Sequence, residues 1–124
     1  LLYSPHSLCR EFYIECTCNM MRPRTIVDYE RIPWILDAGT VRITFDSDVR
    51  AAIGSYDIFD PGLPALSVLE PGKLILEVKF TEMLPQLLRD VLPPPAAEFT
   101  AVSKYVLCYE KTRYMNGFEY WYET

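Results

Sequence analysis

The segment TVRITFDSDVR, residues 40–50, carries the clearest β-strand pattern in this chain of 124 residues. Apolar side chains fall at every second position, which is the period of a strand with one dry face and one wet face. The apolar face holds Val41, Ile43, Phe45 and Val49. The polar face holds Arg42, Thr44, Asp46, Asp48 and Arg50. A sheet with one charged face is therefore expected around this segment.

Two further segments predict strands. Residues 25–36 (TIVDYERIPWIL) are rich in β-branched and aromatic residues, and Pro33 within them indicates a sheet edge, a bulge or a break. Residues 73–80 (KLILEVKF) alternate between two faces, one with Leu74, Leu76, Val78 and Phe80, the other with Ile75, Glu77 and Lys79. The proline- and glycine-rich residues 54–72 predict a loop, of which residues 67–69 are placed against the sheet.

Three segments favour helices. Residues 7–21 fit either a strand or a helix, and the helix is preferred, with Ser7 at its start and Pro23 as its stop. Residues 84–92 predict a short helix with Pro85 in its first turn. A last helix is expected to start near residue 100 and to run through residue 110 or beyond. Its predicted buried stripe consists of Val102, Tyr105, Val106 and Tyr109. A turn is expected at Asn116-Gly117 in the aromatic tail.

Composition indicates one globular domain over residues 1–124, with half of the residues hydrophobic and 23% charged. The net charge of −5 argues against general nucleic-acid binding, which relies on basic domains. No membrane segment and no secretory signal are expected from the short apolar runs, so a cytoplasmic location is predicted. The chain lacks an initiator Met, and we therefore expect a fragment or a processed product.

The cysteines do not form a recognisable metal motif. Cys16 and Cys18 make a C-x-C without a second pair, and His6 is the only histidine. Reduced, partly buried thiols are therefore favoured, with metal binding as the alternative. The remaining cysteines are Cys9 and Cys108.

The charged strand faces have two explanations. They are a solvated surface, as on most half-exposed antiparallel strands, or they line a groove in which bases clamp an anion while Glu77 holds a metal. A carboxylate among bases suits a nucleotide or polyphosphate with Mg²⁺ or Mn²⁺. Asp46 and Asp48 are interpreted as turn or sheet-end acids and are left out of the site. The pattern alone leaves both explanations open.

Four segments in order carry a resemblance: RPRTIVDYER (22–31), VRITFDSDVRA (41–51), FDPGLPALSVLEPGKLILEVKF (59–80) and VSKYVL (102–107). Over about residues 8–110 the chain resembles the VTC domain, the polyphosphate polymerase module of the vacuolar transporter chaperone. The resemblance implies an α+β fold whose antiparallel sheet forms part of a triphosphate-tunnel (CYTH-like) barrel, with flanking helices. The early acid-base alternating strand of tunnel enzymes has no match here. The chain therefore resembles the C-terminal half of that domain, and alone it is expected to be inactive.

The resemblance also implies a function. A polyphosphate chain would be extended from the terminal phosphate of ATP in a basic, metal-dependent tunnel. The partners would be ATP and polyphosphate, and exposed strand edges would allow a homodimer. The alternatives are a non-catalytic polyphosphate- or nucleotide-binding module and a tunnel triphosphatase.

Particular residues follow from the matched motifs. Arg31 and Arg42 would be tunnel bases that bind phosphate, and Ser103 and Lys104 would contact phosphate from a helix. Glu77 would be the ligand of Mn²⁺ or Mg²⁺. Lys79 is added as a phosphate-binding residue because it shares a face with Glu77. Of these residues, Arg42 and Lys104 are the expected catalytic ones.

Overall fold

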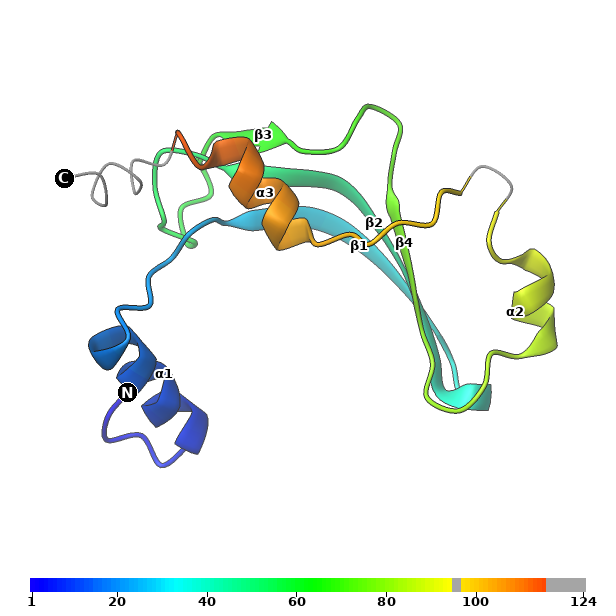
Figure 1. Ribbon diagram of the computed structural model, residues 1–124, viewed down its shortest axis with the longest axis horizontal. Coiled ribbons are helices and arrows are strands. Elements are labelled where there is room, and N and C mark those ends of the chain that lie inside the picture. The colour runs from blue at the N-terminus through cyan, green and yellow to red at the C-terminus, as the bar shows by residue number, and fades with distance from the viewer. Residues whose placement is uncertain (95–96, 116–124) are drawn as a thin grey trace.

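The computed structural model describes residues 1–94 and 97–115 and shows a curved antiparallel sheet with flanking helices (Figure 1). The strands are β1 (Val27–Leu36), β2 (Val41–Ala52), β3 (Ala65–Ser67) and β4 (Ile75–Lys79). The helices are α1 (Ser7–Cys18), α2 (Gln86–Val91) and α3 (Lys104–Thr112), with the short 3-10 turn η1 (Ala38–Thr40) between β1 and β2. The α+β class expected from the sequence is confirmed. The predicted turn at residues 116–117 lies outside the described residues.

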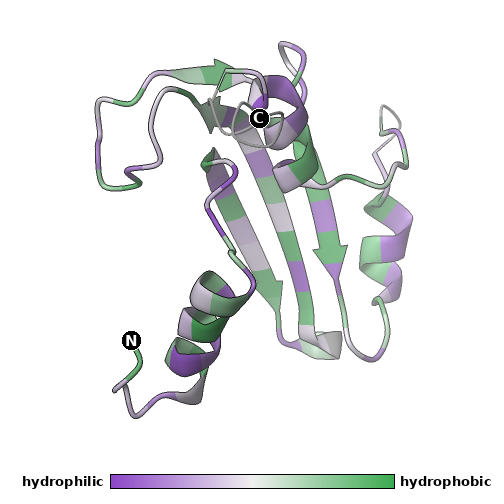
Figure 2. Cartoon of the chain, turned by 60° about the vertical axis from the view of Figure 1, so that its left-hand side comes forward, coloured by the Kyte–Doolittle hydropathy of each residue, from purple (hydrophilic) through white to green (hydrophobic). Residues whose placement is uncertain are grey.

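Strand β2 is the centre of the sheet. It pairs with β1 over most of its length, while β4 pairs with its first half and β3 with its last residues (Figure 2). Pro33 lies in β1, which pairs only with β2 in the described part of the chain, so a proline at a sheet edge is the correct interpretation. Within residues 1–94 and 97–115 the sheet is open and does not close into a barrel.

A bulge in β2 exchanges the two faces of the sheet. The register between β1 and β2 shifts close to Asp48, whose φ is 48°. An extra residue in one strand restarts the alternation of side chains. Val49 therefore lies buried on the face that carries Asp46, and the prediction that it shares a face with Val41 is wrong. Arg50 correspondingly lies on the opposite face of the sheet.

Helix α3 packs on the charged face at the end where β2 is apolar. Cys108 is fully buried against Val49 and Ala51, and the hydroxyl of Thr112 donates to the Cys108 carbonyl at 2.8 Å. Lys104, four residues before Cys108, also points to the sheet, because its ammonium pairs with a carboxylate there. This orientation makes the predicted buried stripe wrong. Three of its members are between 43% and 50% exposed: Val102, Tyr105 and Val106.

The other predicted elements are found with adjusted ends. Helix α1 begins at Ser7, and the His6 imidazole accepts a hydrogen bond from the Leu8 N–H at 3.3 Å. No residue of α1 is buried, and the helix stands apart from the sheet (Figures 1 and 2). Pro85 lies just before α2 as its N-cap. Residues 67–69 do contact the sheet, because β3 ends at Ser67 and the N–H of Val68 donates to the Val49 carbonyl. No helix in the described residues is long and apolar enough to span a membrane.

The thiols match the expected state in most respects. All four cysteines are free; Cys9 and Cys16 are partly buried and Cys108 is buried. Cys18 is exposed, which the sequence did not predict. No group of three His, Cys, Asp or Glu side chains in the described residues is placed to hold a metal ion.

Candidate functional site

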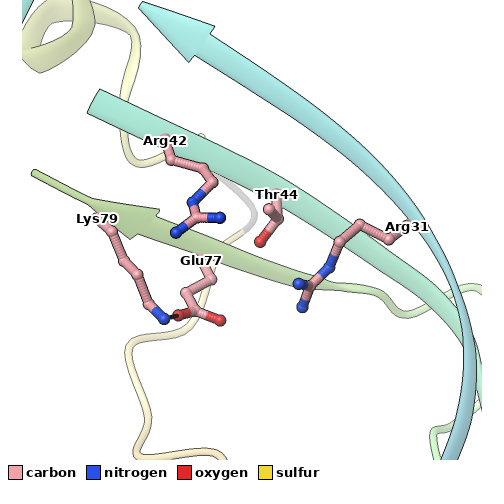
Figure 3. Close-up of a pocket in the computed structure, with 5 residues that line it drawn as sticks. All are labelled: Arg31, Arg42, Thr44, Glu77 and Lys79. Carbon is pink, nitrogen blue, oxygen red and sulfur yellow. Dashed lines mark ion pairs between the residues drawn. The ribbon is translucent and has the colours of Figure 1, made fainter. Parts of the chain in front are cut away.

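A small charged cavity lies on the face of the sheet that carries the alternating polar residues. It has a volume of about 60 Å³ and is lined by Arg31, Arg42, Thr44, Glu77 and Lys79. Figure 3 shows these side chains on one side of the curved sheet, and they belong to β1, β2 and β4. The structure thus brings together four of the residues that the sequence placed in the site.

The strand register explains this convergence. Arg42 stands opposite Lys79, and Thr44 stands opposite Glu77, across the β2–β4 ladder. Directly opposed residues of an antiparallel pair project from the same face. Strand β1 adds Arg31 from the other side of β2. Alternation in two strands and their pairing therefore place one carboxylate among three cations.

Asp46 binds two basic side chains of the predicted site, Arg31 and Lys104. The Arg31 Nε donates to Asp46 Oδ1 at 2.6 Å and the Arg31 Nη2 donates to Oδ2 at 2.8 Å. The ammonium of Lys104, from α3, lies 2.7 Å from the same Oδ2. Asp46 is completely buried. Two basic residues that the sequence assigned to the site are thus joined by a carboxylate that it left out.

Electrostatics keep the Asp46 carboxylate ionised. The hydrogen bonds from Arg31, followed by those from Lys104, lower the pKa of Asp46 to about 2 against the opposing effect of burial. The same hydrogen bonds raise the pKa of Arg31. The Tyr29 ring lies beside both cations, with its centroid 5.0 Å from the Arg31 Cζ and 5.2 Å from the Lys104 Nζ.

Glu77 and Lys79 form an ion pair within the cavity lining. The Lys79 ammonium lies 2.9 Å from Glu77 Oε1. That contact, followed by the positive charges of Lys104 and Arg31, lowers the pKa of Glu77. Arg42 is exposed and makes no ion pair with any residue of the described ranges. It is therefore free to bind an anion without first giving up a partner.

The family model of the VTC domain matches residues 4–113 of this chain. The chain belongs to the VTC domain family. No curated protein and no solved structure matches it. The matched residues include every strand and helix described above. The charged cavity, the ion pairs of Asp46 and the packing of α3 on the sheet all lie within the matched region of this VTC domain.

Ser103 has a different position from the other predicted site residues. It is the N-cap of α3 in this VTC domain, and its hydroxyl accepts from the Val106 N–H at 3.3 Å. It does not line the cavity. Capping explains a serine here without any ligand, and its contact with phosphate stays a prediction. Lys104 likewise lies beside the cavity lining, held by Asp46.

The VTC domain offers a divalent metal one carboxylate in this cavity. Glu77 Oε1 is engaged by Lys79, whereas Glu77 Oε2 has no hydrogen-bond partner among the described residues. Mg²⁺ is often held by one or two carboxylates, with waters and substrate phosphates completing its coordination. The residues present therefore fit a metal that arrives with a phosphorylated ligand, and they do not form a metal cage of their own.

The size of the cavity limits what it can enclose. A volume of about 60 Å³ is about twice the liquid volume of one water molecule. The cavity is small, so a phosphate chain would have to extend beyond it along the sheet. A wider hollow of about 490 Å³ adjoins it at the β1–β2 turn, lined by Ile35, Leu36, Asp37, Thr40 and Arg42. Arg42 thus borders both spaces.

Proposed function

We propose that this VTC domain takes part in phosphoryl transfer of the polyphosphate-polymerase type, in which a polyphosphate chain grows from the terminal phosphate of ATP. The observation that carries the proposal is the convergence of Arg31, Arg42 and Lys79 on one cavity with a single carboxylate, Glu77. Three cations and one carboxylate leave a surplus of positive charge, which suits an anion. Family membership makes the phosphate chain the favoured anion.

Phosphoryl transfer asks a protein mainly for position and charge. Arg42, exposed and without an ion pair in the described part of the chain, is assigned to the transferred phosphoryl group. Arg31 supplies a guanidinium whose direction is already fixed. Lys104 and Lys79 add charge at the two edges of the cavity, and Ser103 is kept as a phosphate contact at the start of α3. We assign the catalytic roles to Arg42 and Lys104.

A divalent cation, Mn²⁺ or Mg²⁺, would neutralise charge on neighbouring phosphate oxygens, and Glu77 is the residue that would hold it. Lys79 would then leave Glu77 and turn its ammonium to the phosphate chain. The wider hollow that Arg42 also lines supports the proposal, since it offers space for the remainder of the nucleotide.

The open sheet favours a second candidate. Transfer to phosphate instead of water requires that water be kept from the reacting phosphoryl group. The described strands supply one charged wall and no enclosure. A module that binds polyphosphate or a nucleotide without extending it, or one that hydrolyses it, therefore stands as the alternative.

The test incubates the chain with ATP, Mn²⁺ and a short polyphosphate primer, and follows chain length, phosphate release and primer binding. Chain growth supports the polymerase directly. Binding without growth is the result expected of this chain alone and shows binding as its own activity, and phosphate release without growth supports a triphosphatase. Arg42→Gln should weaken primer binding about tenfold, as expected for loss of a charge-assisted hydrogen bond. Arg10→Gln is the matched control, since Arg10 is exposed on α1, away from the cavity. A chain that binds neither primer nor ATP contradicts the proposal.

A further inference from the structure

The completely buried Asp46 is a carboxylate that joins two elements of the candidate site. Its side chain is fixed by three contacts, two from Arg31 of β1 and one from Lys104 of α3. Asp46 thus links the sheet to the helix through one ionised group, in addition to the apolar contact of Cys108 with Val49 and Ala51. Within residues 1–94 and 97–115, the other contact of comparable kind between β1 and β2 lies on the far face, where Arg50 Nη2 bonds Asp28 at 2.5 Å in an exposed position.

Burial of Asp46 has a consequence for the two cations. An arginine or lysine side chain carries about 2 kcal/mol of rotamer entropy, which is lost when the side chain grips a ligand. A guanidinium held at both Nε and Nη2 by one carboxylate has already lost most of that freedom. The Lys104 side chain is only 19% exposed, so it too is confined before any anion arrives.

We propose that Asp46 is a positioning residue of the phosphate site, which fixes the Arg31 guanidinium and the Lys104 ammonium at the cavity and so couples phosphate binding to the docking of α3 on the sheet. The inference rests on the proposed function, because it takes Arg31 and Lys104 to contact phosphate. It adds to that function a residue that itself does not touch the ligand.

Charge alone makes the opposite prediction, which allows a clean test. Asp46 is a negative charge close to an anion site. If it acts only through its field, Asp46→Asn removes repulsion and tripolyphosphate binds more tightly. If it positions the two cations, the same substitution releases them and tripolyphosphate binds more weakly, although the net charge of the site has become more positive.

The experiment titrates the 124-residue chain with sodium tripolyphosphate by calorimetry at fixed ionic strength. The expected result is at least about tenfold weaker binding by Asp46→Asn with unchanged far-UV circular dichroism. Asp28→Asn is the matched control, since it breaks an Arg–Asp pair between the same two strands on the opposite face, and its affinity should equal that of the unmodified chain. Equal or tighter binding by Asp46→Asn overturns the inference while leaving the proposed function intact. Absence of binding by the unmodified chain overturns the proposed function itself.

A measurement on the unmodified chain covers the case in which Asp46→Asn does not fold. The Arg31 Nε–H should give a proton resonance protected from exchange with water, because it is bonded to a buried carboxylate. The exposed Arg10 serves as the reference for rapid exchange. Addition of tripolyphosphate should shift the Arg31 signal and leave its protection in place. Exchange as fast as that of Arg10, or a signal that tripolyphosphate does not move, overturns the inference.

Discussion

Arg42 and Lys79 stand directly opposite each other in the β2–β4 ladder, so that two positive charges occupy one register position of the sheet. Like charges at such a position destabilise a sheet. Lys79 is partly compensated by Glu77, whereas Arg42 has no ion pair in the described residues. The two opposed charges lower the stability of the sheet but concentrate positive potential at one place. Binding sites often reduce stability in this way.

The first prediction follows from this opposition of charges. Arg42→Thr should raise the free energy of unfolding by about 0.2–1 kcal/mol, because repulsion across the ladder is lost and threonine suits a strand. The same variant should bind tripolyphosphate more weakly. Urea unfolding without anions measures the first effect and calorimetry the second. A variant that is less stable than the unmodified chain would show that Arg42 is not repelled by Lys79.

Glu77 gives a prediction about metal removal. In the presence of Mn²⁺, Glu77→Gln should lose the increase in tripolyphosphate affinity that the metal provides. Without metal the variant should bind at least as tightly as the unmodified chain, because Lys79 no longer has a carboxylate partner. Calorimetry with Mn²⁺ and then with a chelator separates the two. An undiminished Mn²⁺ effect in Glu77→Gln would remove Glu77 from the metal assignment.

The lowered pKa of Asp46 predicts how the free energy of unfolding depends on pH. Its pKa falls from the usual 3.8 to about 2 in the folded chain. A carboxyl with a lowered folded pKa contributes stability above its unfolded pKa and loses it as the pH falls through the folded pKa. Between about pH 4 and pH 2 the unmodified chain should therefore lose on the order of 2 kcal/mol through this group. Urea unfolding should show a flatter pH dependence for Asp46→Asn, and equal curves would argue against the buried cluster.

The β2 bulge can be tested at Asp48, whose φ of 48° lies in the left-handed region. A β-branched residue is strained there, so Asp48→Val should cost about 1–2 kcal/mol of unfolding free energy. Asp48→Asn should be nearly neutral, since asparagine tolerates this conformation. Chemical denaturation of both variants measures the difference. Equal stability of the two would mean that the extra residue does not lie at Asp48.

The sequence predicted the charged face well where the strands are regular. Alternation alone placed Glu77 and Lys79 together, and pairing with β2 then brought Arg42 beside them. The faces were wrong beyond residue 48, because a bulge breaks the two-residue period that the prediction relied on. The extra residue could not be recognised in the sequence, because the segment already holds two acids, Asp46 and Asp48, and its alternation shows no separate break.

The role of Asp46 could not be predicted for a related reason. An acid on an alternating strand is usually solvated, and only the fold shows that Arg31 and Lys104 enclose it. The prediction of the buried stripe on α3 was wrong because it too relied on local spacing alone. Helix amphipathicity selected the tyrosines, whereas Lys104, Cys108 and Thr112 make up the side of α3 that is paired or buried. A long-range ion pair of this kind is not encoded in local spacing.

Acetylation of two matched lysines provides the most direct test that the cavity binds a phosphate chain. Lys79 and Lys73 are 66% and 60% exposed, and each lies within 2.9 Å of a glutamate oxygen, but only Lys79 lines the cavity. The amount of acetyl group on each is measured by mass spectrometry over a series of tripolyphosphate concentrations. Tripolyphosphate should slow the modification of Lys79 in a saturable manner and leave Lys73 unchanged. Equal protection of both lysines, or of neither, would contradict a phosphate site at Arg31, Arg42 and Lys79.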